Sequence, residues 1–222
     1  MFVFALSSLK AQGVFSMDLQ KQTISTSVDT SILRALTNLG NHRRIPIGIV
    51  LETGNPHQLC EENRQFTIRD RPISDFLDEL LAHSNYIWSV KDGVIAIRPA
   101  HVTDQQNRVL NIRFDKFGGM PTTMQGLGIV LSTWIYSELH PEDHGYVGDI
   151  LASLDAEQFP HFEVRDASVE QILNKIVSLG SKGMWLFQLD KNFEHKRNVD
   201  LYTLSYKDDA NALLSICSTI KN

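Results

Sequence analysis

The fold of this chain is decided by residues Phe66–Leu81, which read FTIRDRPISDFLDELL. The first three residues are typical of a short strand because they combine aromatic and β-branched side chains. From Ile73 onward, apolar residues recur at the spacing of one helix face and acidic residues fall largely on the other side. Pro72 suits a helix start because its φ angle is already close to helical. The stretch therefore predicts a strand, a tight turn and an amphipathic helix that ends near Leu81.

A hairpin follows this helix in the sequence. Residues Tyr86–Val90 and Val94–Arg98 are rich in β-branched and aromatic side chains, and Asp92-Gly93 lies between them. Asp-Gly between two such runs is a strong signal for a two-residue β-turn. We therefore expect two antiparallel strands directly after the helix.

The residues before Phe66 predict one more helix and one more strand. Ile32, Leu36 and Leu39 share one helix face. The candidate N-caps of that helix are Ser27, Asp29 and Thr30, and its candidate C′ residue is Gly40. Residues Ile45–Leu51 are apolar and predict a strand.

The strand-turn-helix stretch recurs later in the chain. Four residues are identical at an offset of 96 (162 − 66), namely Phe66, Arg69, Asp70 and Leu77, which recur as Phe162, Arg165, Asp166 and Leu173. Trp88 in the following strand corresponds to Trp185, at an offset that is one residue longer. The second copy opens its helix with Ser168 and Gln171, the spacing of a capping box. An internal repeat of this kind predicts that one supersecondary unit is built twice.

The second half carries further elements. A helix with Met124, Leu127, Leu131 and Ile135 on one face is predicted to open at residues 121–123. A longer hairpin is predicted to flank the charged segment 190–197, and a short helix is predicted for Asp208–Ile220.

Composition and charge limit the class of partner. The chain has 222 residues, a formal net charge of −5 and a pI of about 5.9. This balance argues against a nucleic-acid partner, which would favour a basic face. No apolar run reaches the roughly 18 residues needed to cross a bilayer, so no transmembrane segment is expected. Residues 1–13 are interpreted either as a signal peptide or as an N-terminal arm of the first domain.

Each half resembles the short N-terminal domain of secretins and TonB-dependent receptors. The match is carried by the first helix and strand, by the 66–81 stretch, and by the ending Asn-Tyr-x-Trp, Lys-Asp-Gly, Val-Ile-Ala-Ile-Arg-Pro. It covers residues 14–99 well and 110–206 less well. The resemblance implies an α+β fold of two tandem small βαββαββ-type domains, each with two helices packed on small sheets.

The predicted domain limits follow from the repeat. Residues 14–100 form the first domain, 101–109 a polar linker, and 110–222 the second, divergent copy with its C-terminal helix. The chain lacks the barrel or pore region that such domains usually precede, so a specific role in secretion or receptor signalling does not transfer.

The resemblance also implies a non-enzymatic protein that binds a protein partner in the cell envelope, in the periplasm or as a secreted protein. The alternative is an adaptor protein that is not exported and stays in the cytoplasm. We expect no cofactor. Small sheets leave unpaired backbone groups at their edges, so strand addition is the expected mode of binding. The candidate partner-binding residues are Ile45, Ile47, Ile49, Val94, Ile95 and Ile97.

A metal-binding protein or metal-dependent hydrolase is the alternative function. His140-Pro141-Glu142-Asp143-His144 offers imidazole and carboxylate ligands that zinc accepts. Pro141 prevents a regular helix from aligning the two histidines, and the sequence marks no third ligand. A solvated loop is therefore the favoured interpretation.

The chain contains two cysteines, Cys60 and Cys217, too few for a disulfide scaffold. If the protein is exported they can pair; otherwise they are ordinary thiols.

Overall fold

The structure is a computed structural model that describes residues 19, 21–53, 58–119, 122–142, 157–159, 161–180, 182–189 and 199–206. The first half contains β1 (Thr23–Ser31), α1 (Ile32–Arg43), β2 (Ile47–Val50), α2 (Gln58–Glu61), β3 (Asn63–Pro72), α3 (Ile73–Leu81), β4 (Tyr86–Lys91) and β5 (Val94–Pro99). The second half contains α4 (Asp104–Leu110), β6 (Arg113–Gly118), β7 (Thr122–Thr123), α5 (Met124–Leu139), β8 (Gln158–Phe159), β9 (Glu163–Ser168), α6 (Val169–Val177), β10 (Gly183–Leu189) and β11 (Val199–Ser205).

A five-stranded sheet in the order β11-β10-β2-β5-β4 joins the two halves. β2 runs parallel to β5 on one side and to β10 on the other, while the outer strands β4 and β11 are antiparallel to their neighbours. Strands of both halves therefore share one sheet, which crosses the domain limit predicted at 101–109. The mixed α+β class is confirmed, whereas two separate βαββαββ units are not.

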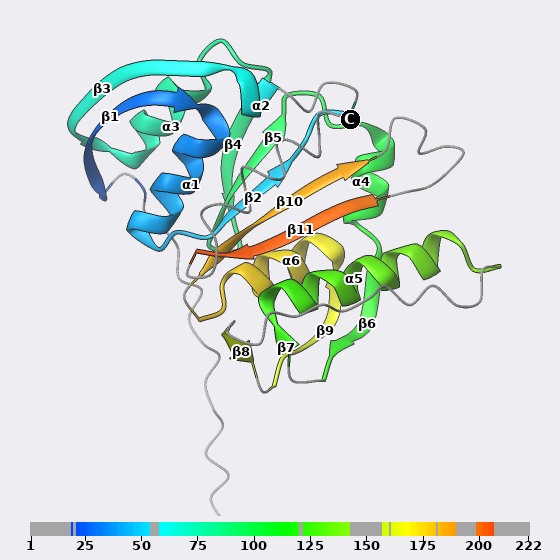
Figure 1. The fold of residues 1–222 in the computed structure, drawn as a ribbon. Coiled ribbons are helices and arrows are strands. Elements are labelled where there is room, and N and C mark those ends of the chain that lie inside the picture. Colours follow the sequence, from blue (N-terminus) through cyan, green and yellow to red (C-terminus); the bar gives the residue numbers. More distant parts are fainter. Residues whose placement is uncertain are drawn as a thin grey trace, which may run out of the picture.

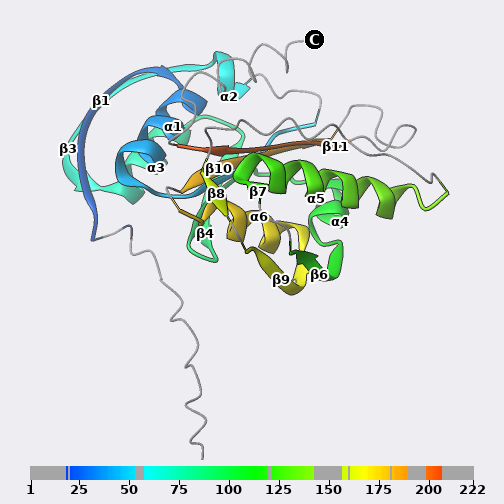
Figure 2. The same cartoon turned by 60° about the horizontal axis from the view of Figure 1, so that its bottom comes forward.

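Two hydrophobic cores lie on opposite faces of this sheet. Alternate residues of each strand face opposite ways, so Met184 and Leu186 of β10 join one core while Trp185 and Phe187 join the other. The first core is completed by α1 and α3, and the second by α4, α5 and α6. Figure 2 shows α5 and α6 together on one side of β10 and β11. Each half thus covers its own face of the shared sheet.

Each half also forms a two-stranded ribbon outside the central sheet. β1 pairs with β3 and β6 pairs with β9, both antiparallel. Figure 1 shows β1 and β3 as a long curved ribbon over α1 and α3. A third pair, β7 with β8, is only two residues long.

The repeated stretch has the same local geometry in both halves. α3 and α6 each span nine residues, and their first residues lie 96 positions apart (169 − 73). The residues Asp70 and Asp166, just before the helices, both adopt left-handed backbone, with φ of 50° and 45°. Aspartate tolerates this conformation better than most residues, which explains why it recurs at this point.

Helix caps are confirmed in the second half and corrected in the first. Ser168 and Gln171 form the predicted capping box, and Thr123 caps α5. In α1 the cap is Ser31, the last residue of β1, whose hydroxyl accepts from the N–H of Arg34, while Ser27, Asp29 and Thr30 lie further back in the strand. Gly40 lies inside α1 rather than after it.

Packing, and not helix capping, requires a glycine at position 40. A Cβ built at this position would lie 2.0 Å from Oη of Tyr206. The Tyr206 hydroxyl donates a hydrogen bond to the carbonyl of Ile45 at 2.9 Å. The glycine therefore lets the end of the second half pack on the first helix.

The predicted linker 101–109 contains a helix. Thr103 and Gln106 form a capping box that opens α4, and the Gln106 amide donates to the Leu51 carbonyl at 2.7 Å. The polar composition that indicated a linker reflects this cap and its buried hydrogen bond. The N-terminal segment 1–13, the charged segment 190–197 and the predicted helix at 208–220 lie outside the described residues.

Candidate functional site

The structure places the six candidate partner-binding residues in the interior. Each is at most 3% exposed; they are Ile45, Ile47, Ile49, Val94, Ile95 and Ile97. β2 lies between β10 and β5, and β5 lies between β2 and β4. Their backbone groups are already paired on both sides, so these strands cannot accept another strand. Among the described residues, the edge of the sheet in the first half is β4.

The sequence contains a signal that distinguishes the interior strand β5 from the outer strand β4. β5 begins with the continuous apolar run Val94–Ile97, the pattern of a strand covered on both faces. β4 mixes apolar and polar residues, with Ser89 and Lys91 beside Ile87. The hairpin was predicted correctly, but in the described part of the chain the edge of the sheet is its outer strand, β4.

The backbone of β4 points outward at Trp88 and Val90. The hairpin closes through the two-residue turn Asp92-Gly93, whose φ angles are 53° and 75°. In such a hairpin the bonded and non-bonded pairs alternate from the turn, beginning with the bonded pair Lys91–Val94. Trp88 and Val90 therefore direct their N–H and C=O groups away from β5. They form a short row of backbone groups that a further strand could pair with.

The side chains along this edge are partly apolar and exposed. Ile87 is 56% exposed and Val90 is 40% exposed. They point to opposite faces of the sheet because side chains alternate along a strand. An exposed apolar edge of this kind is a common site of strand pairing with another chain.

Trp88 is fixed against the helix that precedes β4. Its Nε1 donates a hydrogen bond to Oδ1 of Asp78 on α3 at 2.7 Å. The indole is only half-buried and packs on the rim of the first core. The edge therefore presents a tryptophan whose orientation is already set.

The turn end of β4 is held by a buried carboxylate of the second half. Glu170, the second residue of α6, is 2% exposed and forms ion pairs with Lys91, at 2.5 Å, and with Arg98. Burial lowers the pKa of both cations, and the proximity of Arg98 adds to the effect at Lys91. Asn174, one turn further along α6, donates to Asp92 at 3.3 Å. We call Lys91, Arg98, Asp92, Glu170 and Asn174 the hairpin junction.

The other end of β4 is held by Tyr86. Its hydroxyl oxygen accepts a hydrogen bond from the backbone N–H of Glu52 at 3.0 Å. Burial raises the pKa of Tyr86 to about 12, so the phenol stays neutral. Contacts with neighbouring elements therefore hold β4 at both ends.

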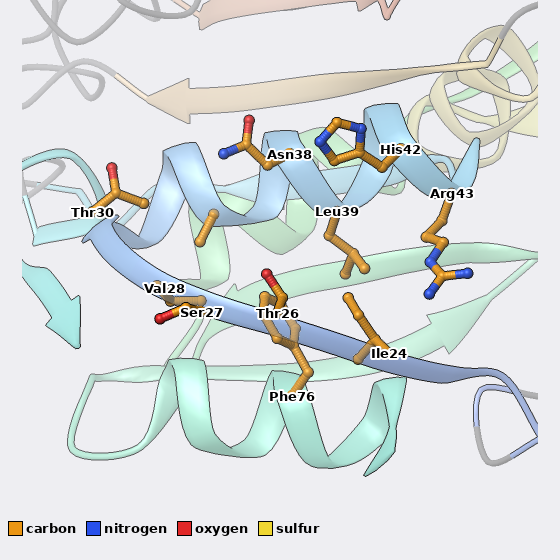
Figure 3. A pocket seen from close by; sticks show the side chains of 11 residues that line it. Ile24, Thr26, Ser27, Val28, Thr30, Asn38, Leu39, His42, Arg43 and Phe76 are labelled. Carbon is orange, nitrogen blue, oxygen red and sulfur yellow. The ribbon is translucent and has the colours of Figure 1, made fainter. Parts of the chain in front are cut away.

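The pocket between β1 and α1 is too small for a typical ligand. Figure 3 shows Leu39 of α1 pointing towards Ile24 of β1, with His42 and Arg43 at one end. The cavity volume is about 80 Å³, whereas small-molecule sites span roughly 300–1,000 Å³. The Arg43 guanidinium is used locally, donating to the carbonyl of Thr23 at 2.9 Å.

The candidate metal ligands are only partly described. His140 follows the last residue of α5, and its ring stacks on Tyr136 with centroids 4.2 Å apart. Glu142 lies 3.9 Å from His140, while Asp143 and His144 are outside the described residues. Among the residues that are described, no group of three or more His, Cys, Asp or Glu side chains has the arrangement to hold a metal ion. The metal hypothesis stays a prediction.

Cys60 of α2 is disulfide-bonded. The other cysteine of the chain, Cys217, lies outside the described residues.

Comparisons of the chain with protein-family models, with curated proteins and with solved structures each found no match. None of the helices in the described parts of the chain combines the length and apolar character required to cross a membrane.

Proposed function

We propose that this chain is a non-enzymatic, protein-binding module of the cell envelope that captures a partner strand at β4. The observation that carries the proposal is the outward-facing backbone of Trp88 and Val90 beside the exposed side chains of Ile87 and Val90. Strand addition obtains affinity from main-chain hydrogen bonds and specificity from the neighbouring side chains.

The anchoring of β4 supports this proposal. The hairpin junction holds one end of the strand and the Tyr86 hydroxyl holds the other. A strand that is already ordered loses little conformational entropy when a partner pairs with it, which favours binding.

Two observations support an envelope location. One is the resemblance of each half to the short N-terminal domain of secretins and TonB-dependent receptors. The other is the disulfide at Cys60, because disulfides persist mainly in oxidising compartments. N-terminal sequencing of the mature protein from fractionated cells checks the location, and recovery in the cytoplasm with reduced cysteines would contradict it.

The binding mode is tested by removing one backbone donor from the edge. Val90→Pro deletes an N–H that faces away from β5, and proline is tolerated at such edge positions. Val90→Thr is the matched control because it keeps both the N–H and the β-branched shape. Each full-length protein is cross-linked in cell envelopes, and the captured proteins are quantified by mass spectrometry.

We expect a partner that is captured by the wild type and by Val90→Thr but lost with Val90→Pro. Thermal unfolding checks that the proline variant is folded. If it is not, the pair Ile87→Lys and Val90→Lys replaces it, since charges on an edge strand block pairing. Equal capture by all variants would show that β4 is not the binding site.

A further inference from the structure

The second half contains a strand that corresponds to β4 and already has a neighbour. β4 follows α3 and β10 follows α6, the two helices of the repeated stretch. Trp88 donates to Asp78, and Trp185 donates to Asn174 at 3.0 Å. Asp78 and Asn174 are themselves 96 positions apart (174 − 78). β4 and β10 are therefore the same strand of the repeated unit.

The neighbour of β10 is β2, and it pairs in parallel. Trp185 lies opposite Gly48, with Ile47 and Ile49 on either side of the glycine. The ladder continues through Leu51, whose N–H donates to the carbonyl of Phe187 at 2.8 Å. The edge of β10 that faces β2 thus carries Trp185 and Phe187, which correspond to Trp88 and Val90.

The glycine in β2 is required by the tryptophan. A Cβ built at Gly48 would lie 2.3 Å from Cε2 and Cζ2 of Trp185, which no real side chain can do. With glycine there, Trp185 is completely buried. Trp88 has the same hydrogen bond to its helix but no such strand beside it among the described residues, and it is only partly buried.

From this correspondence we infer the chemistry and the direction of the partner segment at β4. The edge takes an extended apolar segment that runs parallel to β4 and places a glycine opposite Trp88. The inference rests on the proposed function and adds the register and the sequence pattern. The donor is another protein, because the matching segment of this chain, Ile47–Val50, is enclosed between β10 and β5.

The experiment uses the β2 sequence as a probe. One labelled peptide carries residues 47–51, IGIVL, between terminal lysines for solubility. The matched peptide differs only by alanine in place of the glycine. Binding of each to the full-length protein is measured by fluorescence anisotropy, with the wild type, Val90→Pro, Val90→Thr and Trp88→Ala.

We expect the glycine peptide to bind the wild type and Val90→Thr, and the alanine peptide to bind about tenfold more weakly, as a clash of roughly 1.4 kcal/mol would cause. Trp88→Ala should bind both peptides alike, because the indole that excludes the Cβ is gone. Val90→Pro should bind neither.

Direction is measured with a nitroxide at either end of the peptide. Parallel pairing places an N-terminal label near the amide of Ile87 and a C-terminal label near Gly93, which NMR line broadening detects. The reverse pattern, equal binding of both peptides to the wild type, or no binding up to millimolar concentration overturns the inference.

The outcomes separate the inference from the proposed function. If both peptides bind equally but need the Val90 N–H, the register fails while strand addition at β4 stands. If capture of the envelope partner is also independent of Val90, both fail. A dimer of the chain in sedimentation analysis that dissociates in Val90→Pro would show that a second copy occupies the edge, and it would overturn the inferred partner.

Discussion

Trp88 and Trp185 occupy corresponding places in the two halves and have different surroundings. Each follows a nine-residue helix and donates its indole N–H to an Asp or Asn on that helix. Trp185 is completely buried beneath Gly48 of β2, whereas Trp88 on the outer strand is only partly buried. The hydrogen bond to the preceding helix is shared, and the difference in burial comes from the strand beside each tryptophan. Among the residues that the structure describes, the outer edge of β4 is therefore the position that β2 fills beside β10.

The largest effect should separate the two tryptophans. Trp185→Ala should lower the free energy of unfolding by about 4 kcal/mol, because a large side chain leaves a cavity in a packed core. Trp88→Ala should cost about 1 kcal/mol, since that indole lies on the rim of the first core and is only partly buried. Urea denaturation of both variants measures the difference. Similar losses would mean that the two environments are equivalent.

The next effect should come from the hairpin junction. Glu170→Ala leaves Lys91 and Arg98 without their buried carboxylate. It should lower the free energy of unfolding by about 3 kcal/mol. This is at the lower end for a broken buried ion pair because both cations are partly exposed. Glu163→Ala is the matched control, since Glu163 also pairs with two cations, Lys116 and Arg165, but on the surface. Its loss should be much smaller. Equal losses in denaturation would show that burial of Glu170 contributes nothing.

A smaller effect should follow from filling the space beside Trp185. Gly48→Ala should cost about 2 kcal/mol, because the added methyl group must displace the indole. The double variant with Trp185→Leu should lose less than the sum of the two single changes, since leucine leaves room for the methyl group. Strict additivity in a double-mutant cycle would rule out this steric coupling.

The smallest effect concerns the hydrogen bond that both tryptophans share. Asn174→Ala should cost about 1 kcal/mol or slightly more, because it leaves the buried Trp185 N–H without an acceptor. Asp78→Ala should cost less, since solvent can replace the lost acceptor at Trp88. Thermal unfolding resolves the two, and a larger loss for Asp78→Ala would reverse the expected order.

Local features were predicted well from the residues alone. The helix that ends at Leu81, the Asp92-Gly93 hairpin, the four buried positions of α5 and the Ser168 cap all appear in the structure. Each of these depends on residues within a few positions of one another. Their signals are periodicity, a turn dipeptide and a capping pair, which short-range sterics and hydrogen bonds determine.

Features that depend on distant residues were missed. β1 reads TISTSVDTS, and its hydroxyl-bearing residues resemble helix caps until β3 is seen beside it. Gly40 was predicted to end the helix, but it lies inside α1, where the absence of a side chain leaves space for Tyr206. The candidate edge residues of β2 and β5 looked available because an apolar run indicates that a strand is covered, but does not say which strands pair on either side of it.

The amino-acid order is sufficient to specify the repeated unit, down to the aspartate before each helix and the tryptophan after it. It does not specify which strand lies next to each unit, because backbone hydrogen bonds between strands are nearly the same for every residue type. The choice depends on how both halves pack on one sheet, with β2 placed between β10 and β5. That packing buries Trp185 and, among the described residues, leaves β4 at the edge of the sheet.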